Sequence, residues 1–255
     1  MEMVLLTALG VGFSTVFGAV IGFVFRKISH TFSDIILSFA AGIMLAAAVL
    51  GLIIPSIEYG TEMAGNFAIL ITVAGIFLGA LMISLLDKLV PHLHKPEGEE
   101  LEEHKSNDRV DKVLLFVLAI AIHNLPEGIA AGVGFGTGND AEALMIAIGI
   151  ALQNIPEGMV IIAPMLAAGV SPKKTFMYAA LTGLVEVVGT FIGYFAVSVA
   201  SALLPFALAF AGGTMLYVVS DEMLSETHGD GNQRGATYAL LVGFCVMLVT
   251  DILLG

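Results

Sequence analysis

The chain has few charged residues and almost no cysteine. Only 13% of its 255 residues are Asp, Glu, Lys or Arg, whereas 58% are apolar and the mean hydropathy is +0.97. Soluble domains carry about 25% charged residues, so this composition excludes an ordinary soluble globular protein. The single cysteine, Cys245, excludes an intrachain disulfide and a metal site built from cysteines, and its simplest role is packing in the last apolar run.

The signatures of two enzyme classes are also missing. The chain contains no Gly-x4-Gly-Lys-Ser/Thr motif, so it has no visible means of hydrolysing ATP. It contains no His-Glu-x-x-His motif, which argues against a zinc hydrolase. Its net charge of −12 has the wrong sign for binding nucleic acid. We therefore expect neither an enzyme nor a nucleic-acid-binding protein, and no organic cofactor.

Eight apolar runs are long enough to cross the roughly 30 Å of hydrocarbon in a bilayer, which takes about 20 helical residues. The first run lacks the positively charged start of a signal peptide, so we expect it to be retained. The sequence predicts an all-α membrane protein with eight transmembrane helices, embedded in the lipid bilayer as one domain over residues 1–255. The runs cover about residues 3–25, 34–57, 66–87, 112–136, 142–169, 175–199, 203–220 and 235–254.

The basic residues set the orientation of these runs. When eight spans are threaded, all ten Lys and Arg residues fall on one side, and the connections near 58–65, 137–141 and 200–203 contain none. The positive-inside rule then places both termini on the non-cytoplasmic side of a plasma (inner) membrane. The loop over residues 90–110, which is acidic and contains histidines, lies in the cytoplasm in this topology.

A hexapeptide in the fourth run is repeated in the fifth. His123-Asn124-Leu125-Pro126-Glu127-Gly128 returns thirty residues later as Gln153-Asn154-Ile155-Pro156-Glu157-Gly158. A glutamate inside a membrane-spanning helix is costly, so each copy is a functional-site hypothesis. Each proline also removes a backbone N–H and frees the carbonyl one turn earlier. Each copy therefore gathers a carboxylate, amides and a loosened backbone within about one helical turn.

The two copies are predicted to meet in the middle of the membrane. The fourth run leads outward and the fifth returns, so the copies lie on antiparallel helices. Glu127 lies roughly 22 Å along its helix from Lys112, and Glu157 lies about as far from Glu142. Three runs precede this central pair and three follow it, which suggests an inverted repeat of threes. Glu186, near the middle of the sixth run, is a third intramembrane acid.

These side chains are typical ligands of divalent cations. His123 and Glu127 share a helix face, and imidazole and carboxylate groups bind zinc and related ions. The second copy offers harder oxygen ligands. Amide-rich ligation is weaker than a closed structural zinc site, which suits reversible binding. Taken singly, a buried Glu is equally explained as a protonated, hydrogen-bonded group, and a buried His as a neutral polar contact.

The paired pattern His-Asn-x-Pro-Glu-Gly and Gln-Asn-x-Pro-Glu-Gly resembles the ZIP (Zrt-/Irt-like) divalent metal transporters, and most closely their GufA-like branch. The resemblance covers the whole chain and implies a fold of the ZIP type, a bundle of spans 1, 4, 5 and 6 moving against spans 2, 3, 7 and 8, and a homodimer. It also implies a binuclear site in which both motif glutamates bridge two metals. The implied ligands of the first metal are His123, Glu127, Gln153 and Glu157, and those of the second are Asn124, Glu127, Asn154, Glu157 and Glu186.

One motif position departs from a common pattern of the family. Gln153 stands where many members carry histidine, although this glutamine is similar to other GufA-like sequences. Because imidazole favours zinc, its loss is expected to broaden selectivity toward manganese, iron(II), cobalt and cadmium.

Other polar residues are weaker candidates for the path of the metal. The acidic segment that closes the seventh run resembles the exit of the family, although an acidic helix end in solvent explains it equally well. The cytoplasmic loop offers three histidines, and Met44 and two outer glutamates are candidates for the entrance. The exit candidates are Asp221, Glu222, Glu226 and His228; the loop candidates are His92, His94 and His104; the entrance candidates are Glu58, Glu62 and Met44.

The leading hypothesis is a transporter that imports Zn²⁺, and also Mn²⁺, Fe²⁺, Co²⁺ or Cd²⁺, as its substrates. An intramembrane hydrolase is an alternative, with Glu127 or Glu157 as general base on a metal-bound water. A passive metal channel with the same ligands is another.

Overall fold

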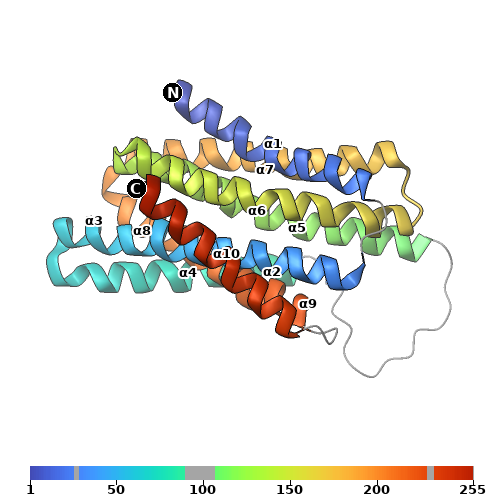
Figure 1. Ribbon diagram of the computed structural model, residues 1–255. Helices are drawn as coiled ribbons and strands as arrows, with labels where there is room; N and C mark the ends of the chain where they lie inside the picture. The colour runs from blue at the N-terminus through green and yellow to red at the C-terminus, as the bar shows by residue number, and fades with distance from the viewer. Residues whose placement is uncertain (26–28, 90–106, 229–232, 255) are drawn as a thin grey trace.

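The computed structural model describes residues 1–25, 29–89, 107–228 and 233–254, and every structural statement below concerns these residues. They form helices joined by short turns, without a β-strand (Figure 1). The long helices are α1 (Glu2–Val24), α2 (His30–Ala46), α3 (Ile54–Ala64), α4 (Ala68–Leu89), α5 (Asn107–Gly134), α6 (Asp140–Ala167), α7 (Pro172–Val199), α8 (Leu204–Tyr217) and α10 (Gln233–Leu254). The short helical segments are η1 (Ala47–Ile53), η2 (Gly65–Phe67), η3 (Phe135–Thr137), η4 (Ser201–Leu203), η5 (Val218–Met223) and α9 (Leu224–His228).

Six helical segments in the described part of the chain are long and apolar enough to cross a membrane. One of them, His30–Leu86, contains a sharp turn at Gly65, whose φ of 55° suits a residue without a side chain. After this turn α4 runs back alongside α3 (Figure 1), so the segment makes two passes. The predicted all-α, multi-pass membrane architecture is confirmed at this level.

Two predicted boundaries are corrected by the structure. The seventh run was expected to end near Ser220 because acidic residues follow it. Instead the helix continues from α8 through the π-helical segment η5 into α9, as far as His228. α5 begins at Asn107, inside the loop predicted over residues 90–110.

The helices pack in pairs that follow a two-fold pattern. α5 packs on α7 as α6 packs on α1, and α4 packs on α8 as α10 packs on α2. The π-helical segments occupy corresponding places, with η1 between α2 and α3 and η5 between α8 and α9. The first three membrane passes (α1, α2 to α3, and α4) correspond in order to the last three (α7, α8 to α9, and α10), and α5 corresponds to α6. This exchange maps each packed pair of helices onto another pair. This is the pairing expected of an inverted repeat around a central helix pair.

The same contacts divide the bundle into two groups. α1, α5, α6 and α7 form one group, drawn above in Figure 1, and α2, α3, α4, α8 and α10 form the other. The groups meet where α6 packs on α2 and α5 packs on α8. A core of small and medium apolar side chains, including Met44, lies across this junction. The functional motifs in α5 and α6 therefore lie where the two groups meet.

Glycines allow the close approach of helices inside the first group. A Cβ added at Gly132 of α5 would overlap the backbone oxygen of Thr190 in α7, and one added at Gly158 of α6 would overlap the backbone oxygen of Thr15 in α1. Small residues at such positions are a general means of packing membrane helices backbone to backbone.

We predict that Gly132→Ala destabilises the protein by about 1–3 kcal/mol, because the added methyl group forces α5 away from α7. Thermal unfolding of the detergent-solubilised protein measures the effect. Gly10→Ala is the matched control, since a Cβ at Gly10 meets nothing within 4 Å. Equal stability of the two variants would contradict the assigned contact.

Candidate metal centre

The two motif copies lie inside continuous helices. Pro126 is within α5 and Pro156 is within α6, and both helices run on past their prolines. The motif side chains point into the bundle: His123, Asn124, Glu127, Gln153 and Asn154 are buried and Glu157 is half-buried. The prediction that both copies reach one interior region is consistent with this burial.

Glu186 of α7 is the point at which four helices are tied together. Its Oε1 accepts hydrogen bonds from Thr15 Oγ1 of α1, at 2.8 Å, and from Asn124 Nδ2 of α5. Its Oε2 accepts from Asn154 Nδ2 of α6, at 2.6 Å. The carboxylate is fully buried, and a buried charge is tolerated only with such donors. The asparagines of both motif copies therefore hold one carboxylate between them.

Beside this network lies a set of buried polar atoms without hydrogen-bond partners in the described residues. They comprise the side-chain oxygens of Asn124 and Asn154, both carboxylate oxygens of Glu127, and both amide atoms of Gln153. Each such atom costs about 1–3 kcal/mol when it is buried without a partner. Because all but one are oxygens that can donate a lone pair, a bound cation is a ligand that would satisfy them.

His123 is paired with a residue from the other helix group. Its Nε2 lies 2.8 Å from Oε1 of Glu222 in η5, which is partly exposed. Glu222 was predicted to belong to the exit segment, and the structure places it against His123 of the motif. No signal in the sequence reveals this contact, because it depends on the helix continuing past Ser220 and on the π-helical turn that carries Glu222.

The acidic side chains are neighbours without forming a closed metal cage. Glu127 lies within the range of electrostatic interaction of Glu157 and Glu186. Glu157 in turn lies within that range of His123 and Glu222. No three His, Cys, Asp or Glu side chains in the described part of the chain are grouped closely enough to hold a metal ion. The described arrangement is therefore that of an open, amide-rich site.

A family model for the ZIP zinc transporters matches residues 92–251. The chain belongs to the ZIP family. Among curated relatives, this ZIP protein is 42% identical over 206 residues to zinc transporter GufA of Myxococcus xanthus, with 80% of each chain covered. It is 34% identical over 323 residues to zinc transporter ZIP11 of Homo sapiens, with 94% of each covered. It is 37% identical over 244 residues to zinc transporter ZIPB of Bordetella bronchiseptica, covering 95% of this chain and 78% of that one.

The family resemblance drawn from the repeated motif is thereby confirmed, including its GufA-like branch. Membership of this family supports divalent metal transport as the function of this ZIP protein. The ligand assignments made from the sequence stay predictions.

The weaker candidates of the ZIP protein lie in varied surroundings. Glu58 and Glu62 are exposed on α3, as Asp221 and Glu226 are beyond α8. Met44 is 1% exposed and belongs to the apolar core, so ordinary packing accounts for it. The imidazole of His228 contacts Thr227 and the Leu224 carbonyl of its own helix, and Thr237 of α10. His92, His94 and His104 lie outside the described residues.

Sequence reasoning missed Thr15. It lies in a run of apolar and small residues of α1 that also contains Thr7 and Ser14, so a threonine there carries no recognisable signal. Only the packing of α1 on α6 and α7 brings its hydroxyl to Glu186.

We predict that Thr15→Val lowers the free energy of unfolding by about 1–3 kcal/mol, because a buried oxygen of the Glu186 carboxyl group loses one hydrogen-bond partner. Thr214→Val is the control, since the equally buried Thr214 hydroxyl donates only to the Ala211 carbonyl of its own helix, at 2.7 Å. Denaturant titration in mixed micelles measures both variants. A loss no larger than that of the control would show that Thr15 does not support Glu186.

Proposed function

We propose that this ZIP protein imports Zn²⁺, together with other first-row divalent ions and Cd²⁺, into the cytoplasm through the site between α5, α6 and α7. The observation that carries the proposal is the set of buried, partnerless oxygens of Asn124, Glu127, Gln153 and Asn154. These oxygens come from both motif copies, and a divalent cation would bind them. Curated relatives that share most of the chain are named zinc transporters.

The proposed ligands divide into two sets that share Glu127 and Glu157. His123 and Gln153 complete the first set, and Asn124, Asn154 and Glu186 complete the second. Glu186 already accepts three hydrogen bonds, so it binds a second metal only by giving up at least one of them. We therefore propose that a metal ion occupies the first set of ligands before the second. In the second set, the asparagine side chains are already held in place by Glu186.

The proposed transport mechanism is alternating access between the two helix groups. In the proposed topology the chain crosses the membrane eight times, both termini lie outside the cytoplasm, and the working unit is a homodimer. The helices pack as two groups, one of α1, α5, α6 and α7 and the other of the remaining helices, and this packing supports a relative motion of the two groups. The His123–Glu222 pair crosses the boundary between them and would be remade in each cycle.

The mutation that tests the site is Glu157→Ala. We expect radiometal uptake into proteoliposomes to fall to the level of empty vesicles, because a bridging ligand is lost. His228→Ala is the control and should retain most of its uptake, since its ring contacts only Thr227, the Leu224 carbonyl and Thr237, none of which is a proposed ligand. Size-exclusion profiles verify that both variants fold. Uptake like that of the unmodified protein in Glu157→Ala would refute the site, and equal losses would place His228 on the essential path.

The same assay separates the remaining possibilities for substrate and mechanism. Competition among Zn²⁺, Mn²⁺, Fe²⁺ and Cd²⁺ should show several ions inhibiting uptake, because Gln153 replaces an imidazole. Uptake that saturates with metal concentration distinguishes a carrier from a passive channel, whose flux rises linearly.

A second mutation, Glu222→Gln, tests the pairing of His123. Glu222 contacts Nε2 of His123 in the metal-free protein, and this contact must break before a metal can bind that nitrogen. Removing the charge of Glu222 should therefore tighten zinc binding about ten-fold, which is the effect of one hydrogen bond to a charged group. Release should slow, so the apparent KM and the maximal rate of uptake should both fall. Asp221→Asn, on the adjacent exposed residue, is the control. Weaker zinc binding in Glu222→Gln would instead make Glu222 a ligand of the metal.

A further inference from the structure

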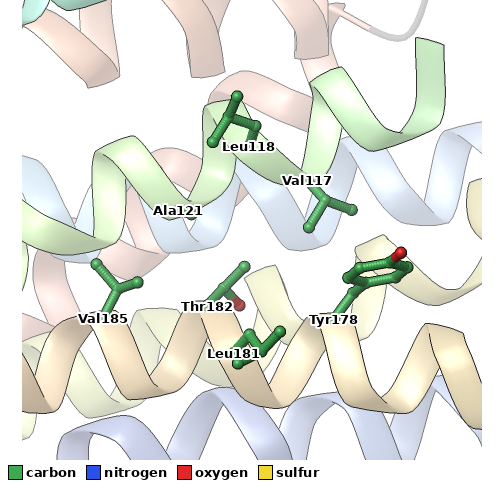
Figure 2. Close-up of a pocket in the computed structure, with 7 residues that line it drawn as sticks. All are labelled: Val117, Leu118, Ala121, Tyr178, Leu181, Thr182 and Val185. Atoms are coloured by element: carbon green, nitrogen blue, oxygen red, sulfur yellow. The ribbon is translucent and has the colours of Figure 1, made fainter. Parts of the chain in front are cut away.

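An apolar groove of about 230 Å³ lies between α5 and α7 (Figure 2), and two of its lining residues, Leu118 and Leu181, are exposed. Val117, Leu118 and Ala121 line it from α5, and Tyr178, Leu181, Thr182 and Val185 line it from α7. The hydroxyl of Thr182 donates to the Ala179 carbonyl of its own helix, at 2.9 Å, so it offers no free polar contact to an occupant. Apart from the hydroxyl groups of Tyr178 and Thr182 the lining is hydrocarbon, so the groove fits an acyl chain better than ordered water.

One end of the groove carries a positive charge. Lys174 is exposed and precedes Tyr178 by four residues, which places it on the same face of α7 as the groove. Tyr178 itself lies at this end, and Val185 lies at the other (Figure 2). Aromatic side chains at the level of lipid headgroups commonly mark the membrane surface. The groove therefore has a charged, interfacial end and an apolar end.

The distance from Lys174 to the far end of the groove matches one leaflet of a bilayer. Val185 lies eleven positions after Lys174, which corresponds to roughly 16 Å along the helix, and the groove lining on α7 covers the part from Tyr178 to Val185. Half of the hydrocarbon thickness is roughly 15 Å. An acyl chain whose headgroup is held at Lys174 would thus end near Val185, which directly precedes Glu186.

We propose that this groove binds an anionic phospholipid, with its phosphate at Lys174 and an acyl chain between α5 and α7. A second copy of the chain fits the groove less well. In a two-fold dimer built on this face, the two Lys174 ammonium groups would lie at the same membrane level and repel each other. The bound lipid would cover the seam between α5 and α7 next to the pair Asn124 and Glu186.

The chain contains no tryptophan, so a single introduced one reports on its own surroundings. Leu118→Trp places the reporter at the groove, where Leu118 is 46% exposed. Leu184→Trp places it on α7 away from the groove lining, where Leu184 is 53% exposed. Quenching by brominated phosphatidylglycerol is compared with quenching by brominated phosphatidylcholine in vesicles otherwise made of unbrominated phosphatidylcholine. Each reporter is compared with itself, so its depth in the membrane does not affect the ratio.

We expect phosphatidylglycerol to occupy the groove about five-fold more strongly than phosphatidylcholine, the ratio given by about 1 kcal/mol per basic residue near a membrane surface. Leu184→Trp should show a ratio near one. Adding Lys174→Gln to Leu118→Trp should bring its ratio to one, whereas adding Lys173→Gln, about 100° around the helix, should preserve it.

Two results would overturn the proposal. Equal ratios for the reporters at positions 118 and 184 would mean that the groove holds only bulk lipid. Absence of quenching at position 118 by either lipid, together with dimers in chemical cross-linking, would mean that a second copy covers the groove.

Discussion

The position of Glu186 is the constraint on which the arrangement of the motif helices depends. A fully buried carboxylate must be surrounded by donors, and here they come from α1, α5 and α6. Each donor fixes its helix relative to α7. The side-chain oxygens of the same two asparagines are buried without a hydrogen-bond partner in the described residues, as are both carboxylate oxygens of Glu127. One buried carboxyl group thus holds the side chains of both motif asparagines, whose oxygens are among the proposed metal ligands.

Backbone packing makes this arrangement possible. Gly128 of α5 lies against the backbone of Glu186, and Gly158 of α6 lies against the backbone of Thr15. The glycine that ends each motif copy therefore contacts a residue of the Glu186 network. A side chain at either glycine position would push the helices apart. The motif glycine therefore permits the close approach of the helices, and this approach brings the motif asparagine within hydrogen-bond distance of Glu186.

Much of this structure could be predicted from the sequence, and the parts that could not depend on tertiary contacts. Apolar runs and the repeated motif predicted a helical membrane bundle with a central pair of motif helices. Glu186 was a candidate because a glutamate flanked by valines is conspicuous in a span. Thr15 was missed because its role exists only through packing. Glu222 was placed too far from the motif, since acidic residues usually mark the end of a span and here the helix continues past them.

The two π-helical segments have equivalent places in the fold and opposite chemistry. η5 carries Ser220, Asp221 and Glu222, whereas η1 consists only of apolar residues and glycine, with Ala47, Ala48 and Leu52 fully buried. Separating the helices at η5 wets groups that already favour water, but separating them at η1 wets hydrocarbon, which carries a hydrophobic cost. The two π-helical segments of a nearly symmetric scaffold thus differ in the free energy of exposing them to water.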